Sequence, residues 1–189
     1  MCFNIFMDKI NFGARKLGTV NVLKLTDKGY TPCKVDLGKF NIASKRDWNK
    51  IEELKDDWNC KLVDILYERC MNLEFDLARK NVFFISEPQK YRLKDKFEPQ
   101  KVLGVALFIQ YPLKNHNFLA ILQKNPKYLS CHQNGFYKHV GQEFINFFKQ
   151  KYCKKPILLY SAPEAKGFYE RLGFINLEGK ENFKYIWKA

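Results

Sequence analysis

The stretch Ser161–Phe174, which follows the apolar run Ile157–Tyr160, constrains the fold more than any other part of the chain. The short apolar run is typical of a buried strand. Ser161 and Glu164 have the spacing of a capping box, which predicts the start of a helix. Apolar residues then recur on one helical face as far as Gly173, a residue typical of the position that ends a helix. The segment therefore predicts a buried strand, a short helix, a tight stop and a second extended run.

The rest of the chain predicts strands and helices in one continuous order, without an internal repeat or a low-complexity linker. Alternating apolar and polar residues on either side of Asp27–Gly29 predict a hairpin. Ser44 and Asp47 mark the expected start of the first helix. Residues 87–100 are polar, contain two prolines and are expected to form a long exposed connection. We expect strands at 19–25, 30–40, 82–85, 102–111, 118–123, 157–160 and 183–187, helices at 44–58, 60–73 and 140–152, and a loop over 125–139.

The composition is that of a globular domain. The chain has 189 residues, of which 46% are hydrophobic, so it can bury a full core. No apolar run is long enough to span a bilayer, and Met1–Met7 lacks the basic region and cleavage site of a signal peptide. Six cysteines at irregular spacings, without a C-x-x-C pair, favour a reducing compartment over a disulfide framework. We therefore expect a cytoplasmic protein.

The net charge is strongly positive, at +13, from 33 Lys and Arg against 20 Asp and Glu. A basic surface attracts polyanions such as nucleic acid and phosphate-rich cofactors. However, a genome rich in A and T would also produce a chain with much Lys, Asn, Ile and Phe. The sequence contains no arginine cluster and no RNP-like or helix-turn-helix motif. Charge alone therefore leaves an RNA or tRNA partner as an open alternative.

The spacing of Ala165, Phe168, Tyr169, Gly173 and Phe174 resembles the acetyl-CoA-side helix of the GNAT superfamily of N-acetyltransferases. The order of the expected strands and helices from about residue 30 onward is also similar to that of the family. The resemblance implies an α/β (α+β) fold with a mixed, largely antiparallel central sheet flanked by helices. Residues 30–189 would form the GNAT-like domain, and residues 1–29 would form an N-terminal extension or hairpin packed on it.

The resemblance also implies a site for acetyl-CoA. In the family a strand end and a glycine-containing loop lead into a helix whose N-terminal amides hold the pyrophosphate. Here Phe136–Gly141 takes the place of that loop, with Phe136 instead of the usual arginine and His139 instead of the first glycine. The cofactor-binding residues that the resemblance implies are Leu122, Gln123 and Lys124 on the strand, Lys138, His139, Val140, Gly141 and Gln142 at the helix start, and Ala162, Ala165 and Phe168 near the next helix.

The chemistry implied by the resemblance is direct transfer of an acetyl group from acetyl-CoA to a primary amine in a ternary complex. A backbone N–H within residues 122–124 would stabilise the thioester oxygen, and Tyr169 would face the departing thiolate as the catalytic residue. No general base is evident, because His116, Glu87 and Glu74 are equally unproven candidates. We expect no metal, because the adjacent Cys131 and His132 lack a second ligand pair at metal-binding spacing.

Three functions stay open at this point. The first is an N-acetyltransferase that modifies an amine of a small molecule, peptide or protein. The second is a GNAT-type toxin that acetylates aminoacyl-tRNA, which the basic charge favours slightly. The third is a non-catalytic interaction module, which the altered cofactor loop favours. We expect no membrane partner, and the sequence does not predict an oligomeric state.

Overall fold

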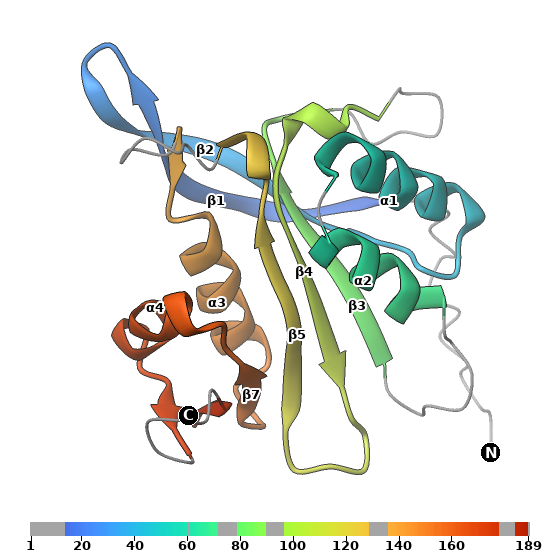
Figure 1. Cartoon of the computed structure of the whole chain (residues 1–189), viewed down its shortest axis with the longest axis vertical. Coiled ribbons are helices and arrows are strands. Elements are labelled where there is room, and N and C mark those ends of the chain that lie inside the picture. Colours follow the sequence, from blue (N-terminus) through green and yellow to red (C-terminus); the bar gives the residue numbers. More distant parts are fainter. Residues whose placement is uncertain are drawn as a thin grey trace, which may run out of the picture.

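The computed structural model describes residues 14–59, 61–71, 79–89, 97–128, 136–177 and 184–188. Their strands form a nine-stranded sheet in the order β6-β1-β2-β3-β4-β5-β7-β9-β8 (Figure 1). Neighbouring strands are antiparallel except β5 and β7, which are parallel. The predicted mixed, largely antiparallel sheet is thus confirmed. The strands are β1 (Arg15–Thr26), β2 (Gly29–Phe40), β3 (Arg79–Ser86), β4 (Val102–Gln110), β5 (Asn117–Lys124), β6 (Tyr137–Lys138), β7 (Ile157–Tyr160), β8 (Ile175–Asn176) and β9 (Lys184–Trp187).

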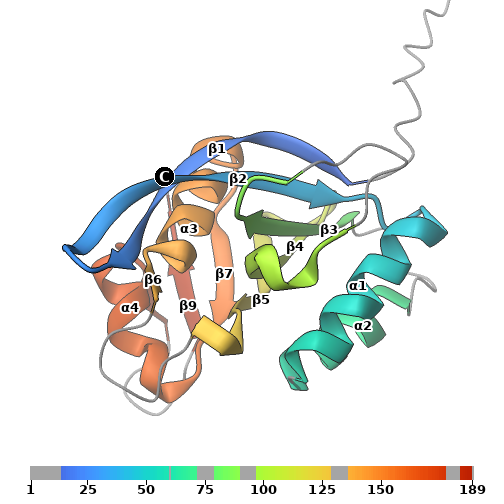
Figure 2. The ribbon, with the colours of Figure 1, turned by 90° about the horizontal axis from the view of Figure 1, so that it is seen from above.

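Helices cover both faces of this sheet, with α1 and α2 on one side and α3 and α4 on the other (Figure 2). Successive strand residues point to opposite faces, so the central strands supply two cores. Phe83 of β3 lies in the core under α3, whereas the next residue, Phe84, lies in the core under α1 and α2. The α-helices are α1 (Lys45–Trp58), α2 (Lys61–Met71), α3 (Val140–Lys151) and α4 (Lys166–Arg171), and the short 3₁₀ helices are η1 (Pro99–Lys101), η2 (Pro126–Tyr128) and η3 (Pro163–Ala165).

Aromatic side chains hold α3 on the sheet. The ring of Phe108 on β4 stacks on Phe148 at a centroid distance of 4.6 Å and on Tyr152 at 4.7 Å. Phe83 meets the edge of Phe148 at 5.3 Å. Such pairs contribute about 0.5–1.5 kcal/mol each beyond the burial of their apolar area. This packing fixes the axis of α3 and therefore the position of its N-terminus.

The N-terminal hairpin belongs to the main sheet. Thr26 pairs with Gly29 across the predicted turn, and β2 continues the ladder to β3 through pairs such as Lys39 with Phe83. β1 also pairs on its other side with β6, a short strand inside the segment that the sequence predicts to be a loop. The first 13 residues lie outside the described part of the chain. The division of the chain at residue 29 stays a prediction.

The C-terminal unit of strand, helix, stop and strand is confirmed, but its predicted capping box is wrong. The hydroxyl of Ser161 donates to the carbonyl of Ala162 at 2.7 Å, and the chain enters η3 without a side-chain cap. The helical segment begins as a 3₁₀ turn with Pro163 in its first turn, where the missing N–H of proline costs no helical hydrogen bond.

The predicted stop at Gly173 is a Schellman motif. Gly173 has φ of +76°, and its N–H donates to Glu170 at 2.9 Å. The N–H of Phe174 donates to Tyr169 at 3.1 Å, so the two bonds satisfy carbonyls at the end of α4. The motif turns the chain back so that Phe174 enters the core before β8.

The expected exposed connection at 87–100 is only partly described, and one residue within it, Phe97, is not exposed. Phe97 is buried against Phe40 on the α1 side of the sheet, at a centroid distance of 6.0 Å. Residues 90–96 lie outside the described part, as do the ends of the helix predicted over 60–73. Among the described helices, none combines the length and the apolar character needed to cross a bilayer.

Replacing Gly173 by alanine should lower the free energy of unfolding by about 1 kcal/mol, because a β-carbon is disfavoured at positive φ. The nearest atom to the new β-carbon would be Lys149 Nζ at 3.8 Å, so backbone strain is the expected cause rather than a clash. Urea denaturation measures the change. Gly18→Ala is the matched control, because that glycine has no positive φ and no atom lies within 4 Å of the place its β-carbon would take. Equal effects of the two changes would contradict this account.

Candidate functional site

The parallel ladder between β5 and β7 is much shorter than β5 itself. It consists of the pairs Asn117 with Ile157, Phe118 with Leu158 and Leu119 with Leu159. β5 continues to Lys124 while it remains paired with β4 on its other side. The register with β4 shifts between Leu119 and Ile121, which leaves Ala120 as a bulge where the pairing with β7 ends. The second half of β5 therefore has a backbone edge that is not paired with β7.

A pocket of about 480 Å³ lies at the start of α3. It is open to solvent and is formed by the end of β5, by β6, by the first turn of α3 and by one face of α4. The described residues that line it are Lys124, Tyr137, Lys138, His139, Val140, Gly141, Gln142, Phe168, Arg171 and Leu172. Seven of the predicted cofactor residues thus meet in one place: Lys124, Lys138, His139, Val140, Gly141, Gln142 and Phe168.

Among the described residues that line the pocket, the charged side chains are all cationic: Lys124, Lys138 and Arg171. The first N–H groups of α3 are directed toward the same end of the helix, where the helix dipole favours negative charge. The pocket is therefore suited to an anion with several oxygen atoms, such as a phosphate or pyrophosphate. The sequence analysis does not single out Arg171, although its spacing from Phe168 places the two on one face of α4.

The structure shows what the side chain of Lys124, one of the predicted cofactor residues, contacts. Its ammonium donates a hydrogen bond to the carbonyl of Tyr137, which joins the end of β5 to β6. Burial, followed by repulsion from Lys138, lowers the pKa of Lys124. The side chain therefore serves both as a bridge between two walls of the pocket and as part of its positive charge.

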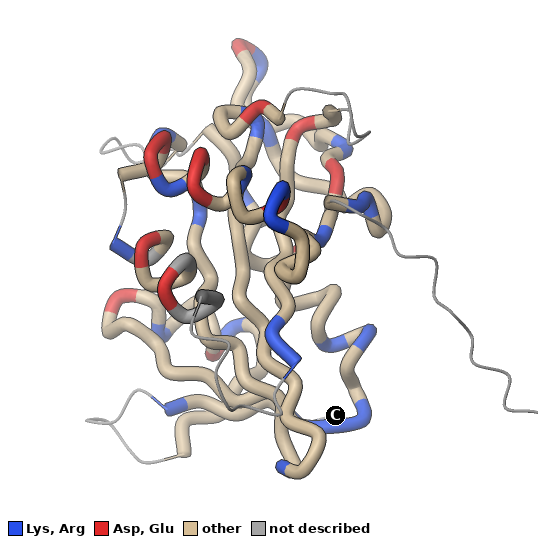
Figure 3. Tube along the Cα trace, turned by 90° about the vertical axis from the view of Figure 1, so that its right-hand side faces the viewer, with Lys and Arg blue, Asp and Glu red and all other residues tan. Residues whose placement is uncertain are grey.

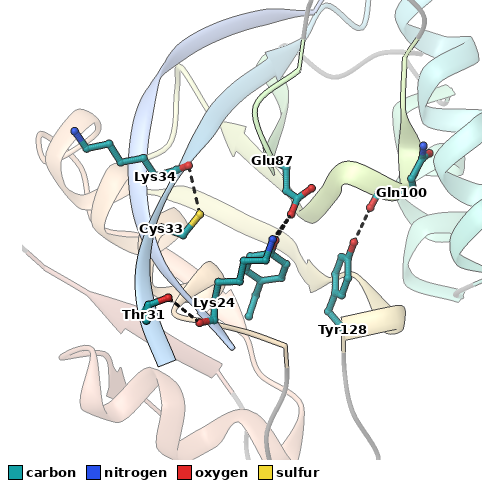
Figure 4. Close-up of polar contacts among 8 residues, drawn as sticks. Lys24, Thr31, Cys33, Lys34, Glu87, Gln100 and Tyr128 are labelled. Atoms are coloured by element: carbon teal, nitrogen blue, oxygen red, sulfur yellow. Dashed lines mark hydrogen bonds and ion pairs between the residues drawn. The ribbon is translucent and has the colours of Figure 1, made fainter. Parts of the chain in front are cut away.

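The side chain of Tyr137 is also held at its hydroxyl group. Its hydroxyl donates to Glu87, and the ammonium of Lys24 lies 3.1 Å from the same carboxylate oxygen (Figure 4). Burial acts to raise the pKa of Glu87, but the hydrogen bonds from Tyr137 and Lys24 outweigh it, so that the pKa is lowered. Tyr128 packs edge-on against Tyr137 at 5.2 Å and donates to the carbonyl of Gln100 at 2.8 Å. These contacts fix β6 beside the pocket, and they engage Glu87, one of the candidate general bases.

The N-terminus of α3 has a backbone conformation that favours glycine. His139 is the N-cap residue and has φ of +69°, a conformation that favours glycine. Gly141 lies against Phe168, and a β-carbon at Gly141 would be 3.1 Å from the Phe168 ring. Position 139 therefore has the left-handed conformation that suits glycine, although the residue there is histidine.

Tyr169 is on α4 but does not line the described pocket. It is 8% exposed, and its ring packs against Phe174 at 5.7 Å and Tyr185 at 6.4 Å. Burial raises the pKa of Tyr169 to about 12. Its phenol is therefore protonated at neutral pH and can act only as a hydrogen-bond donor or acceptor. Its catalytic role stays a prediction.

The other predicted cofactor residues, Leu122, Gln123, Ala162 and Ala165, do not line the described pocket. Leu122 and Gln123 lie on the half of β5 that is not paired with β7, and Ala162 and Ala165 flank η3, which follows β7. Their roles stay predictions.

The remaining candidates for acid–base or metal chemistry do not gather at the pocket. His116 precedes β5 at the end where β5 and β7 are paired, and its pKa is lowered by burial and by Lys114, Lys184 and Lys155. In the described part of the chain, no three His, Cys, Asp or Glu side chains are placed to hold a metal ion. Glu74, Cys131 and His132 lie outside the described residues.

Comparison of the sequence with protein-family models and with curated proteins gives no match. Comparison of the structure with solved structures gives several similar folds. A protein described as a GNAT-family acetyltransferase from Desulfovibrio desulfuricans is 13% identical, with a TM-score of 0.54, over 82% of this chain and 98% of that one. A GNAT-family acetyltransferase from Staphylococcus aureus is 12% identical, with a TM-score of 0.50, over 82% and 98%. Escherichia coli ElaA is 10% identical, with a TM-score of 0.50, over 82% and 99%. The chain has the GNAT fold.

Replacing His139 by glycine should raise the free energy of unfolding by about 1 kcal/mol, because it relieves the strain of a β-carbon at positive φ. His139→Ala removes the same imidazole but keeps the β-carbon, so it should give no such gain. Urea denaturation of the two variants separates backbone strain from the loss of the ring. A gain with alanine equal to that with glycine would contradict the assignment of strain to this residue.

Proposed function

We propose that this protein is an acetyl-CoA-dependent N-acetyltransferase. The observation that carries the proposal is the cationic pocket at the start of α3, which lies beside the half of β5 that is not paired with β7. The GNAT fold supports the proposal because it is the fold of acetyltransferases such as the one from Staphylococcus aureus. Acetyl-CoA is the co-substrate, and a primary amine of a small molecule, peptide or protein is the acceptor.

In the proposed complex the pyrophosphate lies at the first turn of α3, where backbone N–H groups and the cations Lys124, Lys138 and Arg171 face it. The pantetheine arm extends along the edge of β5 that is not paired with β7. Within the described part of the chain no strand pairs with that edge beyond Leu119, and the amide groups of the arm can pair with its backbone groups. A backbone N–H within residues 122–124 then donates to the thioester oxygen as negative charge develops there.

The acetyl transfer itself needs a neutral amine and a stabilised leaving thiolate. The amine nitrogen attacks the thioester carbon, the C–S bond breaks, and the departing sulfur takes the electron pair. The nitrogen, which becomes an amide, releases one proton to water. Tyr169 is the proposed donor to that sulfur. With a pKa of about 12 against about 8.5 for a thiol, full proton donation is uphill by about 5 kcal/mol. Tyr169 would therefore stabilise the thiolate by a hydrogen bond rather than by proton transfer.

Replacing Arg171 by glutamine should weaken CoA binding about tenfold, because a charge-assisted contact with the pyrophosphate is lost. Isothermal titration with CoA measures the change. Lys166→Gln is the matched control, because it removes a charge from the same helix without lining the pocket. Pantetheine, which lacks the pyrophosphate, should bind both variants equally. A loss of CoA affinity in the Lys166 variant but not in the Arg171 variant would contradict the placement of the pyrophosphate.

Replacing Tyr169 by phenylalanine should lower kcat about 100-fold and leave CoA affinity and folding near normal, since only the hydroxyl is removed. The acceptor is first found by screening amines, peptides and aminoacyl-tRNA with a labelled acetyl donor. Tyr185→Phe is the matched control, because it removes a hydroxyl from the neighbouring ring, where it contacts Glu170 at 3.3 Å. Unchanged kcat in the Tyr169 variant would rule out its role, and CoA binding without any turnover would favour a non-catalytic module.

A further inference from the structure

Four cations gather on the α3 side of the sheet, at the end of α3 that is remote from the pocket. Arg15 on β1 lies directly opposite Lys39 on β2, so the two side chains point to the same face. Lys39 donates to Asn81 at 2.5 Å and lies 5.9 Å from the Phe83 ring, which packs against α3. Arg79 shares the face of Asn81 and Phe83 because strand residues alternate. We define the cationic patch as Arg15, Lys39, Arg79 and Lys151, the last at the end of α3.

The four side chains of the cationic patch bring positive charges close together. Like charges directly opposite in neighbouring strands are destabilising, and Arg15 and Lys39 are such a pair. Burial, followed by repulsion from Arg15, Lys151 and Arg79, lowers the pKa of Lys39. Among the described residues, none of the four forms an ion pair with a carboxylate.

The dipole of α3 explains only part of this arrangement. A cation such as Lys151 is stabilised near the C-terminus of a helix. Arg15 and Arg79 lie on strands and gain nothing comparable from their own elements. A bound polyanion would compensate all four charges at once. Figure 3 shows Lys and Arg at several places in the lower half of the molecule, where few Asp or Glu segments are drawn.

The surroundings of the patch are polar, which points to the kind of anion. The amide of Asn81 donates to Gln110 at 3.2 Å. Burial raises the pKa of the half-buried Tyr152, and the nearby charge of Arg15 acts to lower it. Within the described ranges, the exposed large apolar side chains lie elsewhere and not on β1, β2, β3 or α3: they are Leu113, Phe136, Tyr160, Ile175 and Leu177. Membrane binding usually adds apolar insertion to charge, so these features favour a hydrated polyanion over a lipid surface.

We propose that the cationic patch binds the phosphate backbone of a nucleic acid. Amide, phenol and cationic groups are the donors that contact phosphate oxygens without reading base sequence. α3 has 12 residues and is therefore about 18 Å long, so the patch is separate from the pocket at the other end of the helix. Nucleic acid can therefore bind whether or not CoA is present, and the proposal does not depend on acetyl transfer.

The test is fluorescence anisotropy with a labelled 20-nucleotide RNA and a duplex DNA of the same sequence, over a series of salt concentrations. The double variant Arg15→Gln/Arg79→Gln should bind about tenfold more weakly at 0.1 M salt. The slope of log affinity against log salt should become shallower by about 1.5, because two phosphate contacts are lost. Lys151→Gln, an exposed change at the end of α3, should give a smaller change in the same direction.

Lys28→Gln/Lys34→Gln is the matched control, because it removes two exposed cations from the β1–β2 hairpin away from the patch. It should leave the salt slope unchanged. Equal losses in the patch and control variants would show attraction to net charge alone and would overturn the proposal. Tighter binding to anionic phospholipid vesicles than to RNA and DNA would also overturn it. Circular dichroism confirms that each variant is folded.

Discussion

The candidate site depends on how β5 pairs with its two neighbouring strands, because its ladder with β4 is longer than its ladder with β7. β4 pairs with β5 along its length, whereas β7 pairs with it only through Leu119. The bulge at Ala120 lies where that shorter ladder stops, and bulges change the direction and twist of a strand. If β7 continued to pair with β5, the backbone hydrogen-bonding groups on that edge of β5 would be used within the sheet. Because this pairing stops, that edge of β5 is not paired with β7, and it is the edge along which we propose that the CoA arm binds.

The pocket at the start of α3 is built by contacts that converge from several elements. The aromatic packing of Phe148 on Phe108 fixes the helix, and Lys124 joins β5 to β6 through the carbonyl of Tyr137. Glu87 holds the other end of Tyr137 and is itself paired with Lys24 on β1. The N-terminal hairpin thus contributes to the pocket through the main sheet. This network stabilises a positively charged cavity that would otherwise be opened by repulsion among its own cations.

Most of the fold could be predicted from the sequence because its signals are local. The apolar run Ile157–Tyr160 predicts a strand, the spacing from Ala165 to Phe174 predicts the helix and its stop, and Gly173 has the positive φ that the stop requires. The loop to which the resemblance assigns cofactor binding could be located because it lies between a recognisable strand and helix, and its role stays a prediction. Arg171 and β6 could not be predicted because their roles depend on contacts between distant segments. The capping box failed because the Ser161 hydroxyl bonds the Ala162 carbonyl instead, a local competition that spacing alone does not reveal.

The central claim is that a CoA arm lies along the half of β5 that is not paired with β7, with its pyrophosphate at the first turn of α3. Amide chemical shifts, followed by NMR during a titration with CoA, test it most directly. The account predicts that the amides of residues 121–123 on β5 and of Gly141 and Gln142 on α3 shift together and saturate at one ligand per chain. No shift, or shifts confined to segments away from β5 and α3, would contradict it.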